Sequence, residues 1–349
     1  MFFGLPAIAQ ISISGKVLDD HTGLPLPGAS IYFNNSTIGT YADKDGKFTL
    51  SAAQTLTELV VTMIGYDVMV HNTSREEAVN RIVFRLMPKQ TDLEDILIVS
   101  DETRRKWLQL FSENFLGLTE EAAQTSISNA ANIYFIKGED DYLRARSDSP
   151  LLLINKMLGY KLYFTLVEFG FSEKKHSSYF TGFTRYEELG DPEKYRKKRL
   201  NAYYGSTMHF YRSLLHNQLE QEKYFLFIKE LDSSVSAKKP RTNFRPVTAS
   251  AIVRPDSINK DLFKLQWQGK LAVEYRKEPS SKRFLQGKYI IEGDAPQGFI
   301  AYLDLTVPYM FLNSQGTISD PLHMMYNGYW IYEKAANFLP YDYEPQAKK

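Results

Sequence analysis

Two histidines, an arginine and a glutamate lie at helical spacing in the C-terminal half of the chain: His209, Arg212, His216 and Glu220. Two imidazoles and a carboxylate are ligands that zinc accepts. However, the histidines are seven residues apart, which leaves about 10 Å between their Cα atoms on a helix, and Arg212 places a cation between them. The pattern therefore opposes a metal. It fits either an anion or glycan contact or a structural stripe on the helix.

Two consecutive helices must position these side chains. Asp191 and Pro192 have the residue types of an N-cap and a first turn, and we expect the helix that they open to end at Gly205. Ser206 then caps a second helix, whose predicted apolar stripe is Met208, Tyr211, Leu215 and Leu219. Tyr203, at the end of the first helix, joins His209, Arg212 and His216 as a candidate binding residue.

Other residues that could do chemistry give weaker signals. Asp19, Asp43 and Asp45 have the side chains that calcium prefers, but carboxylates in turns also accept hydrogen bonds from turn amides. Ser206 lacks the flanking glycines of a Gly-x-Ser-x-Gly nucleophile, since Tyr204 and Met208 stand there. We therefore predict no catalytic residue, no metal beyond the weak calcium candidates, and no cofactor.

Composition excludes several classes of function. The 349 residues contain no cysteine, which removes disulfides, thiol nucleophiles, iron–sulfur clusters and cysteine-ligated zinc. Lys and Arg total 42 against 41 Asp and Glu, so no global field attracts nucleic acid. No apolar run approaches the roughly 18 residues of a membrane helix, and we expect no transmembrane segment.

The N-terminal third has the layout of a β-sandwich: about seven short strands separated by strong turn signals. Its strands are predicted at residues 11–17, 29–33, 37–41, 47–50, 59–63, 67–71 and 82–86. Gly46 closes the Asp43-Lys44-Asp45-Gly46 turn, where a residue with a positive φ is favoured.

At these positions the chain resembles the carboxypeptidase-regulatory-like domain, also called the peptidase-associated domain, a transthyretin-like sandwich. The matching motifs are Gly15-x-Val17-x-Asp19, Gly23-x-Pro25-Leu26-Pro27-Gly28-Ala29, Gly39-Thr40-x-x-Asp43-x-Asp45-Gly46-x-Phe48 and Ile64-Gly65-Tyr66. The following run, Leu93–Val99, is similar to the strand after this domain in starch-utilisation-type TonB-dependent transporters of Gram-negative outer membranes. The resemblance thus implies a cell-envelope protein.

The family name does not make this chain a peptidase. In metallocarboxypeptidases the sandwich is an appendage, and zinc sits on a separate domain marked by His-x-x-Glu. None of the six histidines here is followed by Glu three residues later. We therefore expect a chain without enzymatic activity.

The remaining residues are predicted to form an α+β domain with a mainly antiparallel sheet. Gly159–Phe169 is its strongest strand, and Ser178–Phe183 is expected to pair with it as a hairpin. Ser233–Pro246 is predicted to be a mobile loop or a break, whereas Gly287–Glu292 and Tyr329–Tyr332 are predicted strands. This half also resembles the uncharacterised C-terminal part of exported carboxypeptidase-like regulatory domain-containing proteins, through motifs such as Arg199-x-x-Ala202-Tyr203-x-Gly205-Ser206 and Gly328-Tyr329-Trp330.

The first residues, ending in Ala7-Ile8-Ala9, fit the cleavage pattern of a signal peptide. We therefore expect export to the periplasm or outer membrane of a Gram-negative bacterium and, without cysteine, no lipoprotein. The predicted organisation is a signal remnant at 1–9, the sandwich at 10–90, a connecting strand at 91–100 and the α+β domain at 101–349.

These observations predict a non-enzymatic envelope protein. The sandwich would act as a docking module, and the α+β domain would bind a protein partner, such as a TonB-dependent transport system, or a glycan. The alternative is an envelope hydrolase, acting on peptide or glycan, with a dispersed site around His209.

Overall fold

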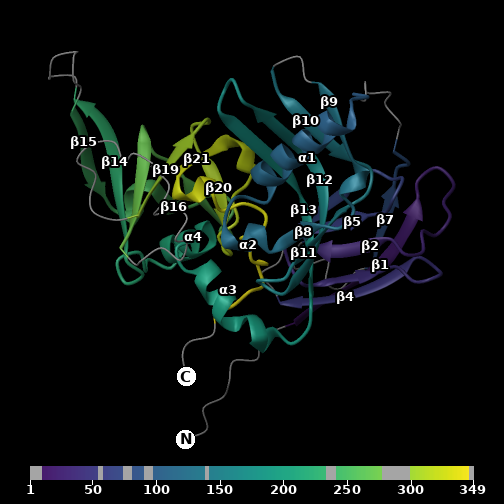
Figure 1. The fold of residues 1–349 in the computed structure, drawn as a ribbon. Coiled ribbons are helices and arrows are strands. Elements are labelled where there is room, and N and C mark those ends of the chain that lie inside the picture. The colour runs from purple at the N-terminus through teal and green to yellow at the C-terminus, as the bar shows by residue number, and fades with distance from the viewer. Residues whose placement is uncertain are drawn as a thin grey trace, which may run out of the picture. The chain divides into compact units, whose positions relative to one another are not determined.

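The computed structural model describes residues 10–53, 58–73, 81–89, 97–137, 141–232, 241–276 and 299–345. The chain divides into two compact units, which are described separately. Figure 1 labels their helices and strands. The first contains the chain up to Phe111, Thr125–Pro192 and the segment from Pro340. The second contains Ser112–Gln124 and Glu193–Leu339. This division by compactness differs from the domain boundaries predicted from the motifs, which stay a prediction.

The N-terminal region is a sandwich of seven strands in two sheets, as predicted. Its strands are β1 (Gln10–Asp19), β2 (Ser30–Phe33), β3 (Gly39–Tyr41), β4 (Lys47–Ala53), β5 (Glu58–Thr62), β6 (Met69–Asn72) and β7 (Ile82–Leu86). One sheet has the order β4-β1-β7, and the other has the order β3-β2-β5-β6. Strand β7 runs parallel to β1, and all other pairs are antiparallel.

The core of the sandwich follows from alternation along its strands. Ile13 and Val17 on β1 are buried, and the Phe48 and Phe84 rings stack between the flanking strands with centroids 5.7 Å apart. Gly15 interrupts the alternation because a Cβ at this position would lie 2.1 Å from the carbonyl oxygen of Ile82. The glycine therefore permits the close approach of β7 to β1.

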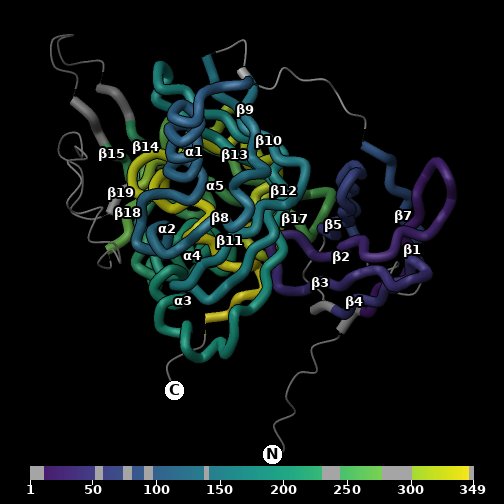
Figure 2. The backbone as a smooth tube through the Cα atoms, turned by 45° about the vertical axis from the view of Figure 1, so that its right-hand side comes forward, coloured from purple at the N-terminus to yellow at the C-terminus, as the bar shows by residue number. Residues whose placement is uncertain are grey.

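The same unit contains a six-stranded antiparallel sheet covered by a helix. Helix α1 spans Asp101–Phe115, and the strands are β8 (Thr125–Ile127), β9 (Ile133–Lys137), β10 (Leu143–Ser147), β11 (Leu151–Asn155), β12 (Tyr160–Ser172) and β13 (Ser177–Glu188). The predicted hairpin is confirmed, since β12 and β13 pair from Tyr160 to Ser172. Helix α1 packs on this sheet through Trp107 against Phe135 and Phe111 against Phe169. Figure 2 shows the backbone of α1 alongside that of the sheet.

The turn between β2 and β3 joins the sandwich to the six-stranded sheet. The Asn35 N–H donates to the Thr184 carbonyl (2.7 Å), and the Tyr186 N–H donates to the Ser36 carbonyl (2.9 Å). Beside them, the Arg185 guanidinium lies between the rings of Tyr41 and Tyr163, 4.6 and 4.3 Å from their centroids. We call the turn and these three side chains the sandwich joint.

The segment after Pro340 closes the sandwich joint from its other side. The Tyr341 N–H donates to the Asn35 carbonyl (2.6 Å), and the Asp342 carboxylate accepts from the backbone N–H of Thr37 (2.9 Å) and from its hydroxyl. The Tyr341 side chain packs against the sandwich core. Residues about 300 positions apart therefore stabilise the same turn.

The second unit contains two antiparallel sheets and most of the short helices. Its helices are α2 (Glu120–Ala123), α3 (Arg196–Tyr203), α4 (Thr207–Leu215) and α5 (Ala249–Ile252). The larger sheet contains, in spatial order, β15 (Arg241–Val247), β14 (Tyr224–Asp232), β18 (Lys270–Tyr275), β19 (Phe299–Leu305) and β21 (Met324–Gly328). The smaller sheet contains, in spatial order, β16 (Val253–Pro255), β17 (Leu262–Leu265) and β20 (Met310–Asn313).

Two local predictions in this unit are wrong. Of the predicted loop at 233–246, the part from Arg241 onward is strand β15, which pairs with β14 because backbone pairing outweighs the turn-rich composition. Residues 233–240 lie outside the described residues. The strand predicted at Tyr329–Tyr332 is a 3-10 turn over Tyr329–Ile331. Gly328 ends the preceding strand β21 with φ +78°, which turns Trp330 into the core. The strand predicted at residues 287–292 lies outside the described residues.

Within the described part of the chain, every helix is too short or too polar to cross a bilayer.

Candidate functional site

The turn between α3 and α4 positions the candidate residues. Gly205 adopts φ +90°, a conformation that glycine supplies without strain, and it lets the chain reverse between the two helices. Ser206 is the N-cap of α4, as predicted: its hydroxyl oxygen accepts from the His209 N–H at 3.2 Å and donates to the Tyr203 carbonyl at 2.7 Å. The Trp330 indole N–H donates to the Gly205 carbonyl at 2.8 Å. The turn is therefore held from both sides.

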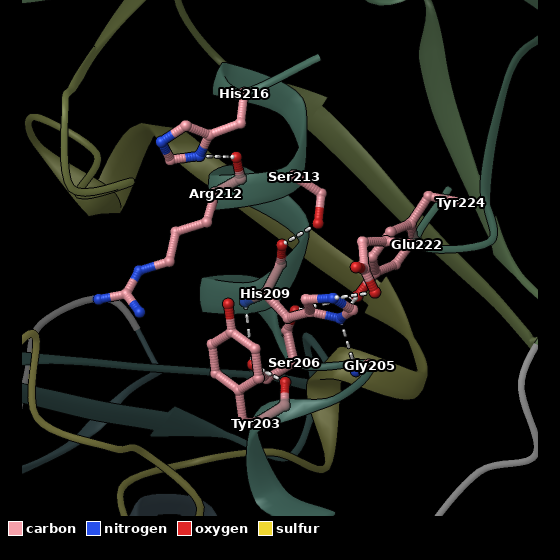
Figure 3. Close-up of polar contacts among 9 residues, drawn as sticks. All are labelled: Tyr203, Gly205, Ser206, His209, Arg212, Ser213, His216, Glu222 and Tyr224. Carbon is pink, nitrogen blue, oxygen red and sulfur yellow. Dashed lines mark hydrogen bonds and ion pairs between the residues drawn. The ribbon is translucent and has the colours of Figure 1, made fainter. Parts of the chain in front are cut away.

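The His209 ring is buried among aromatic side chains, and 2% of the residue is exposed (Figure 3). Its ring centroid lies 4.9 to 6.0 Å from those of Tyr203, Tyr204, Tyr224 and Tyr275. We call these four rings, His209 and Glu222 the His209 cluster.

Both nitrogens of the His209 ring have partners within this cluster. Nε2 lies 3.2 Å from a Glu222 carboxylate oxygen. Nδ1 lies 3.2 Å from the Gly205 N–H nitrogen and 3.0 Å from the Tyr224 hydroxyl. Because a backbone N–H can only donate, Nδ1 must accept, and the ring proton belongs on Nε2, where it is donated to Glu222. The contacts thus select one neutral tautomer of His209.

Tyr224 is a proton donor rather than a base in this cluster. Burial, together with the nearby Tyr275 and the carboxylates of Glu333 and Glu222, raises the pKa of the Tyr224 hydroxyl well above its usual value. The hydroxyl keeps its proton for His209 Nδ1 or for the Ser206 carbonyl, which is 3.4 Å away.

The structure unites only part of the predicted stripe. Tyr203 lies between His209 and Arg212, whose guanidinium carbon is 5.8 Å from the Tyr203 ring centroid. His216 is exposed at the end of α4, and its Nδ1 contacts the Arg212 carbonyl at 2.8 Å (Figure 3). Helix α4 ends at Leu215, so Glu220 lies in the following turn and not on the helix. The prediction of one continuous stripe is therefore wrong.

The buried face of α4 also differs from the predicted apolar stripe. His209, Phe210, Tyr211, Ser213 and Leu214 are buried, whereas Met208 and Leu215 are only half-buried. The Ser213 hydroxyl donates back to the His209 carbonyl at 2.7 Å, which lets a polar residue face the core. Leu219 is buried beyond the helix end.

A second polar group, in the same unit, surrounds Glu333. The Asn337 amide donates to the Glu121 carboxylate (3.0 Å), and the Thr119 hydroxyl donates to the Asn337 side-chain oxygen (2.9 Å). Burial and the neighbouring Glu121 charge raise the pKa of the Glu333 carboxyl to about 8, although a hydrogen bond from Tyr329 acts in the opposite direction. Burial also lowers the pKa of the adjacent Lys334 to about 8.

These two shifts predict a minimum in stability near pH 8. The folded state holds the Glu333 proton more tightly than the unfolded chain, so stability falls as the pH rises from about 4.5 towards 8, by at most about 1.4 kcal/mol per pH unit. Lys334 loses its proton more readily in the folded state, so stability rises from about pH 8 towards 10.5. Urea unfolding, followed by tryptophan fluorescence, measures both slopes.

Other groups also titrate, so the informative quantity is the difference from a matched variant. Glu333→Gln should remove the slope below pH 8, and Lys334→Met should remove the slope above it. An unchanged slope between pH 5 and 8 in Glu333→Gln would contradict this account.

The calcium candidates Asp19 and Asp43 accept hydrogen bonds from N–H groups of their own turns. The Asp19 carboxylate accepts from the N–H groups of His21 and Thr22 and from the Tyr66 hydroxyl, at 2.7 to 2.8 Å. Asp43 accepts from the N–H groups of Asp45 and Lys47. Over the described ranges, no group of three histidine, aspartate or glutamate side chains could hold a metal ion.

We accordingly expect calcium to leave the sandwich unchanged. The melting temperature of the full chain should be the same in 5 mM calcium chloride and in 5 mM magnesium chloride, because an ion that does not bind the folded state cannot stabilise it. A rise seen with calcium alone, and lost in Asp43→Asn, would restore the calcium hypothesis.

The two ring nitrogens of His209 contact Gly205, Tyr224 and Glu222 in the interior. The Glu222 side chain, 25% exposed, is the part of the pair that reaches water.

Sequence reasoning missed Glu222, Tyr224, Tyr275 and Trp330. Glu222 follows His209 by thirteen residues, in a turn, and no helical or strand period connects the two. Tyr275 and Trp330 come from β18 and from the turn after β21. The aromatic richness of the chain was the available signal, but it does not specify which rings meet.

Comparison with known proteins identifies the N-terminal region. The model of the CarboxypepD_reg-like domain family matches residues 13–98, which contain the seven sandwich strands from Ile13 onward. No curated protein matches the chain. The N-terminal quarter of this chain, residues 13–98, is a CarboxypepD_reg-like domain.

Proposed function

We propose that this chain is an exported, non-enzymatic protein of the Gram-negative cell envelope. In this proposal the CarboxypepD_reg-like sandwich is a docking module, and the α+β region binds a protein partner, such as a TonB-dependent transport system, or a glycan. The family match supports the sandwich module. Export is supported by the small-residue pattern Ala7-Ile8-Ala9 and by the envelope context that the motifs imply.

The state of His209 is the observation that carries the non-enzymatic proposal. It is the residue in the C-terminal two thirds that sequence reasoning singles out for chemistry, and it is 2% exposed with both ring nitrogens engaged. A nucleophile or base without a route to substrate does not turn over. This burial favours binding over hydrolysis.

The sandwich joint supports a module that is presented in a fixed orientation. Backbone hydrogen bonds at Asn35 and Ser36 link the β2–β3 turn to the six-stranded sheet. The Asp342 carboxylate holds the same turn through the Thr37 N–H. A partner docked on the sandwich would therefore be held at a set position with respect to that sheet.

A pull-down with the purified chain tests this proposal. Envelope extract from a Gram-negative bacterium is passed over the immobilised chain, and retained proteins and glycans are identified by mass spectrometry. We expect a transport protein or a glycan to be recovered, and a chain with residues 13–98 deleted serves as the control for the docking module. Recovery of nothing, together with turnover of a peptide or glycan panel, would overturn the proposal.

A hydrolase is the second candidate, and the His209–Glu222 pair favours it. A carboxylate 3.2 Å from an imidazole nitrogen is the arrangement that orients a catalytic histidine. This candidate requires turnover that Glu222→Gln abolishes while the melting temperature is kept within a few degrees.

A further inference from the structure

The three-stranded sheet β16-β17-β20 has one buried face and one outward face. Leu265, Met310 and Leu312 are 0 to 3% exposed and belong to the core of the second unit. Because side chains alternate along a strand, the residues between them point away from that core. The outward face is formed by Arg254, Lys264, Tyr309 and Phe311.

Register brings these four side chains together. Arg254 on β16 is paired with Lys264 on β17, and Lys264 is paired with Phe311 on β20. Tyr309 precedes Phe311 by two residues, and their rings meet edge to face at 5.5 Å. The Lys264 ammonium lies 3.8 Å from the centroid of the Tyr309 ring, and Tyr309 is 44% exposed.

The two cations on this face make their direct contacts with neutral groups. Arg254 donates to the neutral side-chain oxygen of Gln266 at 3.1 Å, and Lys264 contacts the Tyr309 ring. Among the described residues, neither forms an ion pair within 4.0 Å. The Asp256 carboxylate accepts from the Asn259 and Ile258 N–H groups of its own turn, and these bonds, together with the charge of Lys264, lower its pKa. The surface therefore offers positive charge beside the exposed Tyr309 ring.

We propose that this outward face binds an acidic carbohydrate. The apolar C–H face of a pyranose ring can stack on Tyr309, while its carboxylate pairs with Lys264 or Arg254. The strands at the two edges are about 10 Å apart, since two strand spacings separate them, and this matches the length of a disaccharide. The inference rests on the proposed function, because it assigns a site and a ligand class to its glycan alternative.

Binding of oligogalacturonate to the full chain tests this site, with the methyl-esterified oligomer of equal length as the uncharged control. Titration calorimetry should show the acid form binding at least about tenfold more tightly than the ester, and more weakly as salt is raised. Lys264→Gln, Arg254→Gln and Tyr309→Ala should each weaken binding of the acid about tenfold, the loss expected for one charge-assisted contact. Lys197→Gln removes an exposed charge from α3 and should change Kd less than twofold.

Two outcomes would overturn the inference while leaving the proposed function intact. One is equal affinity for the acid and the ester. The other is a Kd that Lys264→Gln, Arg254→Gln and Tyr309→Ala leave unchanged. If the chain binds neither oligomer but still captures an envelope protein, the inference fails and the protein-partner alternative stands. Cleavage of the oligomer would contradict the proposed function itself.

Discussion

Replacing His209 with alanine is expected to lower the free energy of unfolding of the second unit by about 3–5 kcal/mol. The substitution deletes a ring packed among four tyrosines and leaves the Gly205 N–H and the Tyr224 hydroxyl without the nitrogen that accepts from them. It also leaves the Glu222 carboxylate without the Nε2 proton. Urea unfolding, followed by the fluorescence of Trp267 and Trp330, measures the loss.

His216→Ala is the matched control for this prediction. His216 lies at the end of the same helix but is exposed, and its Nδ1 contacts the Arg212 carbonyl. We expect a loss below about 1 kcal/mol for this variant. Equal losses in the two variants would contradict the structural role assigned to His209. Tyr224→Phe should fall between them, near 1 kcal/mol, because it removes one hydroxyl.

Arg185→Ala is expected to destabilise the first unit by about 2–4 kcal/mol and to loosen the sandwich joint. The Arg185 side chain is 6% exposed, stacked between two tyrosine rings, and paired with Glu187 at 2.9 Å. The same guanidinium donates to the Tyr41 hydroxyl on β3. Removing it takes away the side-chain contacts of Arg185 with Tyr41 on β3 and Tyr163 on β12.

Limited proteolysis combined with thermal unfolding measures this effect. In Arg185→Ala the CarboxypepD_reg-like domain should be released faster than from the native chain, and the first unit should melt earlier. Arg196→Ala is the control, because its ion pair with Glu193 at 3.2 Å is exposed on both sides and should contribute less than about 0.5 kcal/mol. A sandwich released no faster from Arg185→Ala than from the control would show that the joint does not hold it.

Patterns that repeat over a few residues predicted the local structure well. Alternation at Ile13 and Val17, the turn at Gly46, and the long β12–β13 hairpin all follow from side-chain period and turn chemistry. The Ser206 cap was equally readable, because an N-cap serine needs only the next turn of helix to act. These features depend on neighbours within about ten residues.

The candidate site could not be read in the same way, because its partners come from distant segments. Trp330 approaches Gly205 across 125 positions of sequence, and Arg185 meets Tyr41 across 144. A local reading placed His209, Arg212, His216 and Glu220 on one stripe, whereas the helix ends at Leu215 and buries only the first of them. The composition around β15 likewise predicted a loop, because it does not reveal the pairing of this strand with β14.

The central claim is that the chain binds without catalysing a reaction and that the His209 cluster is structural. The most direct test incubates the native chain and the Glu222→Gln variant with peptide and glycan panels, and analyses products by mass spectrometry alongside capture of bound ligand. The account predicts ligand capture by both proteins and product formation by neither. Product formed by the native chain and abolished in the folded Glu222→Gln variant would contradict it.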